Sequence, residues 1–108
     1  MYNPFNKNIS EIEYEDLKRL IDNNVSEGWF IEYKESFPKN KKIANSIASF
    51  ANSNGGWYII GIKESDNESK PSNIIGFDIN NNKKPTDKIT NIVKDNIDPI
   101  PYFESKVI

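Results

Sequence analysis

Residues 49–62 read SFANSNGGWYIIGI, and this stretch carries the clearest structural signal in the chain. Its first residues complete a pattern of apolar side chains at helical spacing that starts near Ile43. Gly55 and Gly56 predict the end of this helix and a tight reversal, because glycine adopts the backbone conformations that helix ends and turns require. The run WYIIGI (57–62) is almost continuously apolar, which is typical of a central strand covered on both faces.

Two more elements are expected upstream of this stretch. Residues 29–34 (WFIEYK) alternate between two sets of side chains and predict a half-buried strand, with Trp29 on the same face as Ile31 and Tyr33. Ser10-Glu11-Ile12-Glu13 has the spacing of a capping box, and it predicts a helix that continues to about Asn24.

The downstream part predicts three further elements. A polar turn over residues 64–73 is followed by a short partner strand over 74–77. Pro85 is suited to the first turn of a helix that ends at Asp98-Pro99, and residues 102–108 predict another strand. This order of elements predicts an α+β fold, in which a small mixed β-sheet is flanked by helices. We expect residues 1–108 to form a single domain at the N-terminal end of a longer protein, truncated in its last strand.

The composition excludes several kinds of site. The 108 residues contain no cysteine and no histidine, so disulfides, thiolate metal sites and histidine catalysis are ruled out. Chemistry must therefore use carboxylates, lysines, hydroxyls or an oxygen-bound metal. No segment has the length of roughly 20 apolar residues that spans a membrane, and the N-terminus lacks the pattern of a signal peptide. We therefore expect a cytoplasmic protein without membrane partners.

Three carboxylates are candidates for a site. Glu27 precedes the first predicted strand, Glu32 lies within it, and Glu64 follows the central strand. A straight strand would point Glu27 and Glu32 to opposite faces, unless a bulge or turn at Gly28 breaks the alternation. Clustered acids without histidine suit a hard cation such as Mg²⁺ or Mn²⁺. The alternative is that these glutamates are solvated or paired with a lysine such as Lys34.

Lysines and aromatic residues are candidates for nucleic-acid contacts. One lysine group surrounds the exit of the first strand: Lys34, Lys39, Lys41 and Lys42. A second group follows later in the chain: Lys83, Lys84, Lys88 and Lys94. Either group would give salt-sensitive binding to phosphates, or it serves solubility alone. Three aromatic side chains would stack on bases if they are not part of the core: Trp29, Trp57 and Tyr58.

Three segments resemble motifs of one known family. Residues 27–34 (EGWFIEYK) resemble the E-x4-E-[FY]-K segment of Schlafen AlbA-like domains of the AlbA_2 type. Residues 49–62 resemble the family's [AS]-F-A-N-x-x-G-G-x-x-x-I-G-[VI] segment, and residues 74–77 (IIGF) resemble the short strand that follows. The match covers about half of the chain, in the same order and with sensible spacing.

The resemblance implies two kinds of activity. In nucleolytic Schlafen proteins, two glutamates and a later aspartate form a triad associated with metal-dependent cleavage of structured RNA. Here these positions correspond to Glu27, Glu32 and Glu64. In such a site, Lys34 would neutralise the negative charge of the phosphate. The third position departs from the pattern, because it is glutamate and follows Lys63 where the family often has an acid. Other bacterial relatives are described as DNA-binding or ATP-binding regulators, but the chain lacks the Lys-[Ser/Thr] of a phosphate-binding P-loop.

The leading interpretation is a nucleic-acid-binding domain, for DNA or structured RNA, within a larger regulatory or defence protein. The first alternative is a metal-dependent endoribonuclease that uses Glu27, Glu32 and Glu64 with Mg²⁺ or Mn²⁺. The second alternative is a non-catalytic module for docking or for assembly into a homo-oligomer.

Overall fold

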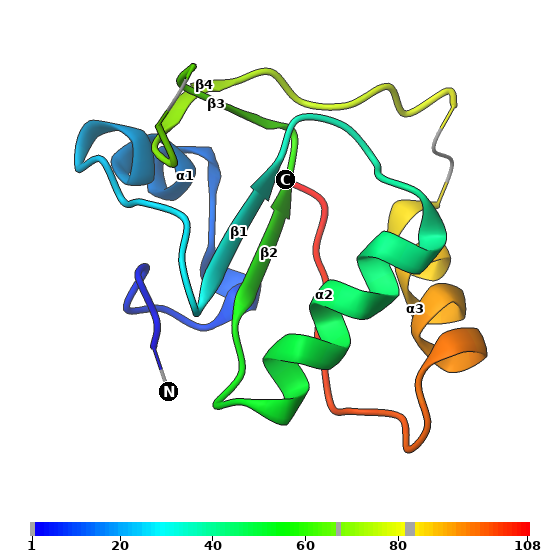
Figure 1. Ribbon diagram of the computed structural model, residues 1–108. Helices are drawn as coiled ribbons and strands as arrows, with labels where there is room; N and C mark the ends of the chain where they lie inside the picture. Colours follow the sequence, from blue (N-terminus) through cyan, green and yellow to red (C-terminus); the bar gives the residue numbers. More distant parts are fainter. Residues whose placement is uncertain (1, 67, 82–83) are drawn as a thin grey trace.

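The computed structural model describes residues 2–66, 68–81 and 84–108 and has an α+β architecture (Figure 1). The elements follow one another as η1 (Ile9–Glu11), α1 (Tyr14–Asp22), β1 (Ile31–Lys34), α2 (Asn40–Asn52), β2 (Trp57–Ile60), β3 (Ile62–Glu64), β4 (Pro71–Ile74) and α3 (Pro85–Asn96). The predicted class is confirmed. The expected mixture of parallel and antiparallel pairing is present in two separate sheets. The β1–β2 sheet is parallel, and the β3–β4 sheet is antiparallel.

The centre of the fold is the parallel pair β1–β2, which α2 connects. Ile31 lies opposite Trp57, and Lys34 lies opposite Ile60. Because side chains alternate along a strand, Ile31 and Tyr33 point to one face of β1 while Glu32 and Lys34 point to the other. The burial of β1 follows this alternation, since Ile31 and Tyr33 are buried and the two charged residues are only partly covered.

The hydrophobic core is divided into two clusters. One cluster joins Leu20 of α1 to Ile31, Tyr33 and Ile62. The other joins α2 to α3 through three buried residues, Ile43, Ala44 and Ile92, with Tyr58 of β2 packed against it. In Figure 1, α1 lies to the left of the β1–β2 pair and α2 and α3 lie to its right. The central strands therefore have a packed helix on each side.

The predicted continuous strand over 57–62 is interrupted at Gly61. This glycine has φ +105°, and its carbonyl accepts hydrogen bonds from the N–H groups of Ile75 (2.8 Å) and Gly76 (2.9 Å). The chain thereby leaves β2 and enters the antiparallel pair β3–β4. The partner strand is Pro71–Ile74, so the expectation of a strand over 74–77 was three residues too late.

The α2 and α3 helices have the expected ends. α2 stops at Asn52, and Gly55, with φ 88°, donates a 2.9 Å hydrogen bond to the carbonyl of Phe50. α3 begins at Pro85 as predicted. The helix expected from Ser10 is instead a short 3-10 turn followed by α1, because Asp16 accepts a 2.9 Å hydrogen bond from the Glu13 N–H and starts the helix there.

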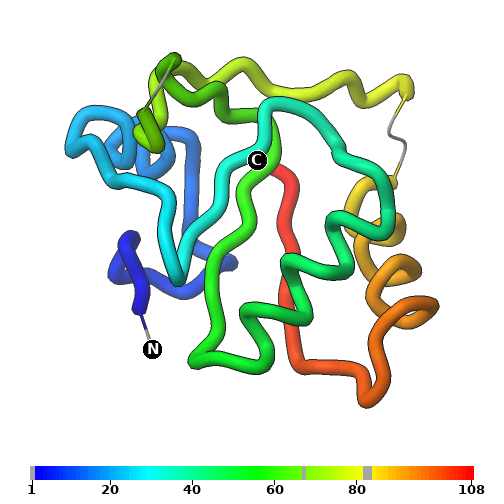
Figure 2. Tube along the Cα trace, in the orientation of Figure 1, coloured from blue at the N-terminus to red at the C-terminus, as the bar shows by residue number. Residues whose placement is uncertain are grey.

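The strand predicted over 102–108 is absent, because this segment makes no backbone pairing within the described residues. It is held through a side chain instead. The Lys106 Nζ donates to the carbonyls of Ser10 (2.9 Å) and Ile12 (2.7 Å), which attaches the C-terminal segment to the segment that precedes α1. Figure 2 shows this segment as the red end of the trace.

Candidate functional site

A tight turn brings Glu27 back alongside β1. The chain reverses at Trp29 and Phe30, where Gly28 forms an antiparallel bridge with Ile31 and donates a 3.0 Å hydrogen bond to its carbonyl. The turn folds Glu27 back along β1, where its carboxylate reaches the backbone N–H of Tyr33. The strand predicted over 29–34 therefore begins two residues late, at Ile31, and Trp29 belongs to the turn.

Glu27 is tied to the backbone of β1. Its Oε2 accepts a 2.9 Å hydrogen bond from the N–H of Tyr33, and its own N–H donates to the carbonyl of Ser69 at 2.7 Å. The Tyr33 hydroxyl donates to the carbonyl of Val25 at 2.7 Å. The Glu27 carboxylate thus accepts the hydrogen bond of the Tyr33 N–H, a backbone group of β1 that is not paired with β2.

Glu32 is paired with Lys34 on the same face of β1. The Lys34 Nζ lies 3.2 Å from the Glu32 Oε2, and the two side chains are 37% and 23% exposed. A partly exposed ion pair of this kind contributes little stability, because solvent screens the attraction. Both charged groups therefore remain accessible to a ligand.

Glu64 shares the electrostatic environment of the other two acids. Burial raises the pKa of Glu64, the charges of Glu27 and Glu32 raise it further, and Lys34 opposes them. The charges of the other three residues predicted as a site, Glu27, Glu32 and Lys34, therefore all act on Glu64 at the end of β3. Within the described residues, however, no three acidic side chains are arranged so that they hold a metal ion. The glutamates as placed here do not fit the expected Mg²⁺ or Mn²⁺ site.

The first turn of α2 is strongly basic. Lys39 is its N-cap residue, Lys41 and Lys42 follow in the first turn, and all three are exposed. This turn contains no acidic residue, in contrast to α1 with Glu15 and Asp16. None of the three lysines forms an ion pair with another described residue.

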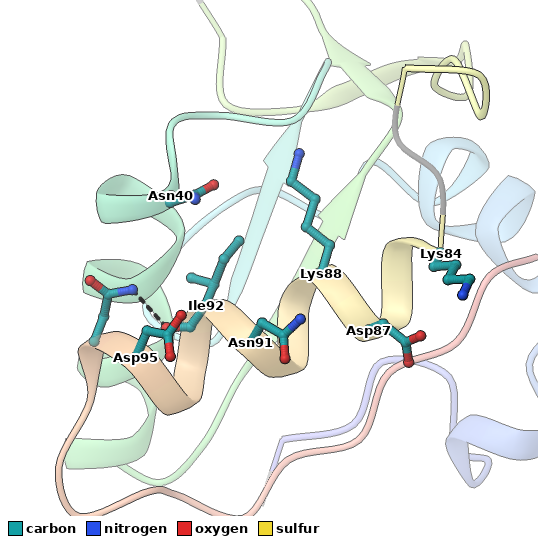
Figure 3. Close-up of a pocket in the computed structure, with 8 residues that line it drawn as sticks. Asn40, Lys84, Asp87, Lys88, Asn91, Ile92 and Asp95 are labelled. Carbon is teal, nitrogen blue, oxygen red and sulfur yellow. Dashed lines mark hydrogen bonds between the residues drawn. The ribbon is translucent and has the colours of Figure 1, made fainter.

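A pocket that the sequence did not predict lies between α2 and α3 (Figure 3). Its volume is about 550 Å³, and it is lined by Asn40, Lys84, Asp87, Lys88, Asn91, Ile92, Asp95 and Asn96. The Lys88 Nζ lies 4.5 Å from the centre of the Phe37 ring. Lys83 of the second lysine group lies outside the described residues. The sequence did carry a signal for this pocket. Polar residues recur every three or four positions from Lys84 onward, and this spacing places them on one face of a helix.

The three aromatic candidates have different surroundings. The Trp57 Nε1 donates to the carbonyl of Tyr2 at 2.9 Å, and its ring packs edge-on against Phe5. Burial raises the pKa of Tyr58 to about 12, the charge of Glu32 adds to this, and the Ser46 side chain opposes it. The Tyr58 hydroxyl is buried without a hydrogen bond of normal geometry to a described residue. Trp29 is 86% exposed.

The comparisons with known proteins agree with the sequence motifs. The family described as Schlafen, AlbA_2 matches residues 27–108. The match includes the three candidate acids Glu27, Glu32 and Glu64, called the acidic cluster below, and extends past α3. No curated protein and no solved structure matches the chain. In the part of the chain that the structure describes, no helix has the length and apolar character needed to cross a membrane. The chain belongs to the Schlafen AlbA_2 family, which places it among nucleic-acid-related domains.

Proposed function

We propose that this chain is a nucleic-acid-binding domain, for DNA or structured RNA, and that it serves a larger regulatory or defence protein. The observation that supports the proposal best is the first turn of α2, where Lys39, Lys41 and Lys42 are exposed together and no acid accompanies them. Lys34 precedes this turn in the chain, at the end of β1, where it is paired with Glu32.

Phosphate is the ligand that suits this turn. The N-terminus of a helix carries a partial positive charge and free N–H groups, so lysines placed there repel it and one another. A phosphate group relieves this repulsion, since it accepts hydrogen bonds from the N–H groups and neutralises the lysines. The net charge of −2 for the whole chain makes a local patch necessary, because long-range attraction to nucleic acid is weak.

A charge-reversal experiment tests the proposal. The affinity of the full chain for duplex DNA, single-stranded DNA and a structured RNA is measured by fluorescence anisotropy over a series of salt concentrations. We expect affinity to fall steeply with salt, and Lys41→Glu/Lys42→Glu to weaken binding at every sequence. The control is Lys18→Glu/Lys70→Glu, which changes the net charge equally at exposed positions on α1 and just before β4.

The outcomes separate three roles. Equal loss of affinity in both double variants would indicate a general charge effect and place the contact elsewhere. Absence of binding by the unmodified chain would contradict the proposal. It would favour a module for docking or for assembly into a homo-oligomer. Sedimentation of the same sample would then reveal a homo-oligomer.

Metal-dependent cleavage of RNA by Glu27, Glu32 and Glu64, with Lys34 steadying phosphate charge, is the second candidate function. It is supported by the raised pKa of Glu64, to which the charges of Glu27 and Glu32 contribute. It is disfavoured by the present geometry, because Glu27 is bound to the backbone of Tyr33 and Glu32 to Lys34. We therefore rank binding above cleavage, and Glu32→Gln is the variant that tests cleavage directly.

A further inference from the structure

Trp29 is exposed to an unusual degree at the tip of the turn that joins Glu27 to Glu32. This residue is 86% exposed, although tryptophan is one of the largest apolar residues and is usually well buried. The expected alternation along residues 29–34 would have buried it with Ile31 and Tyr33. The turn removes Trp29 from the strand, so its ring is available to a ligand.

The neighbouring aromatic residues hold this turn in place. The Phe30 ring lies 6.0 Å from the Tyr2 ring, and the carbonyl of Phe30 accepts a 2.8 Å hydrogen bond from the N–H of Trp57. The Trp57 indole in turn donates to the carbonyl of Tyr2. The turn is therefore anchored to β2 and to the N-terminal segment. A ligand that contacts Trp29 meets a preorganised support, which reduces the entropy lost on binding.

We propose that Trp29 stacks on an unpaired base, so that the domain binds single-stranded or locally unpaired nucleic acid in preference to a continuous duplex. This inference rests on the proposed function and adds the class of nucleic acid. An aromatic ring stacks on any base through its flat face, but only when the base is not already stacked within a helix.

The surroundings of Trp29 favour a base over a protein partner. A protein interface usually surrounds its central aromatic residue with further apolar contacts that exclude water. The nearby Ser26 and Gly28 are exposed and offer no such rim, and Glu27 is charged. Phe30 is partly buried and Tyr2 is 39% exposed, so Trp29 has the most exposed ring of this turn, and its face has about the area of one base.

The position of Trp29 is also compatible with the basic residues. Lys34 lies five positions after Trp29, so their Cα atoms are at most about 18 Å apart. Lys39, Lys41 and Lys42 follow beyond the end of β1. A strand of a few nucleotides stacked on Trp29 thus has the charge of Lys34 within its reach.

Tryptophan fluorescence and matched variants test the inference. The full chain is titrated with oligo-dT, oligo-U and a blunt duplex of equal length. We expect the single strands to quench the emission of wild-type protein. Trp29→Ala should bind them about tenfold more weakly or worse, as expected for the loss of one stacked base, and bind the duplex unchanged. Trp29→Phe should recover part of the affinity. The control Tyr102→Ala removes a ring that is 88% exposed in the C-terminal segment and should have no effect.

Each result has a distinct meaning. Unchanged single-strand affinity in Trp29→Ala, with loss of binding in Lys41→Glu/Lys42→Glu, would overturn the stacking role and leave the binding function intact. An equal loss for single strands and duplex would also overturn it. A Trp29→Ala variant that changes the oligomeric state while binding single strands normally would assign Trp29 to a protein contact. If the wild-type chain binds no nucleic acid, both proposals fail together.

Discussion

The Glu27 carboxylate accepts a 2.9 Å hydrogen bond from the backbone N–H of Tyr33, across the turn formed by Trp29 and Phe30. A side chain therefore takes the place of a neighbouring strand at the edge of β1. This relationship gives Glu27 a structural role within the acidic cluster, and it sets Glu27 apart from Glu32, whose carboxylate contacts a partly exposed lysine.

Removal of the Glu27 carboxylate should destabilise the fold. Glu27→Ala leaves the Tyr33 N–H without its acceptor, and we expect the free energy of unfolding to fall by about 1–3 kcal/mol. Glu27→Gln retains an acceptor oxygen and should lose less. Urea denaturation followed by circular dichroism measures both. Glu32→Ala serves as control, since loss of its ion pair should change stability by less than about 1 kcal/mol. Equal stability of Glu27→Ala and wild type would show that water replaces the carboxylate without penalty.

Glu32→Gln separates binding from cleavage. If the acidic cluster cleaves RNA, this nearly isosteric change should abolish Mn²⁺-dependent cleavage of transfer or ribosomal RNA and leave the fold intact. RNA binding should be preserved or strengthened, because one negative charge near the phosphates is removed. Gel assays with Mg²⁺ or Mn²⁺ measure cleavage by wild type and variant. No cleavage by wild type would contradict the nuclease function on these RNAs. Cleavage that persists in the variant would exclude Glu32 as an essential residue.

Two glycines in the site region should respond differently to alanine. A Cβ added at Gly28 meets no atom within 4 Å, so Gly28→Ala should change stability by no more than about 0.5 kcal/mol. Gly61 has φ +105°, and a Cβ there would lie 3.0 Å from the Cα of Gly76. Gly61→Ala should therefore destabilise the protein by about 1–3 kcal/mol. Thermal unfolding of the two variants measures this difference. Similar midpoints for Gly28→Ala and Gly61→Ala would contradict the close approach of Gly61 to Gly76.

Asp16 should make stability depend on acid pH. The hydrogen bond from the Glu13 N–H lowers the pKa of Asp16, Lys7 and Arg19 lower it further, and burial opposes them. A carboxyl whose pKa is lower in the folded state stabilises the fold above its unfolded pKa, and this contribution disappears as the pH falls through the folded value.

Urea denaturation between neutral pH and about pH 3 measures this effect, in a range set by the usual carboxyl pKa. Asp16→Asn should be less stable than wild type at neutral pH and should lose less stability on acidification. Asp22→Asn, at the exposed end of α1, is the matched control. If the free energy of unfolding depends on pH as steeply in Asp16→Asn as in wild type, Asp16 is excluded as the source of the pH dependence.

The sequence by itself determined the elements whose signals are local. The ends of α2 and α3 were predicted correctly, because Gly55 and Pro85 impose backbone conformations that depend little on distant residues. The sequence motifs also selected Glu27, Glu32 and Glu64, which the structure brings into one electrostatic neighbourhood.

Tertiary structure decided the features that depend on partners remote in the sequence. The apolar run over 57–62 cannot reveal that Gly61 turns toward Gly76, and the alternation over 29–34 is the same whether Trp29 is buried or lies in a turn. The segment 102–108 has the composition of a strand but no paired neighbour among the described residues. The bonds of Glu27 to Tyr33 and of Glu32 to Lys34 were likewise set by the turn and the strand. A strand exists only through hydrogen bonds to another segment, whereas a helix satisfies its own backbone, so strand ends and acid partners became fixed only when the chain folded.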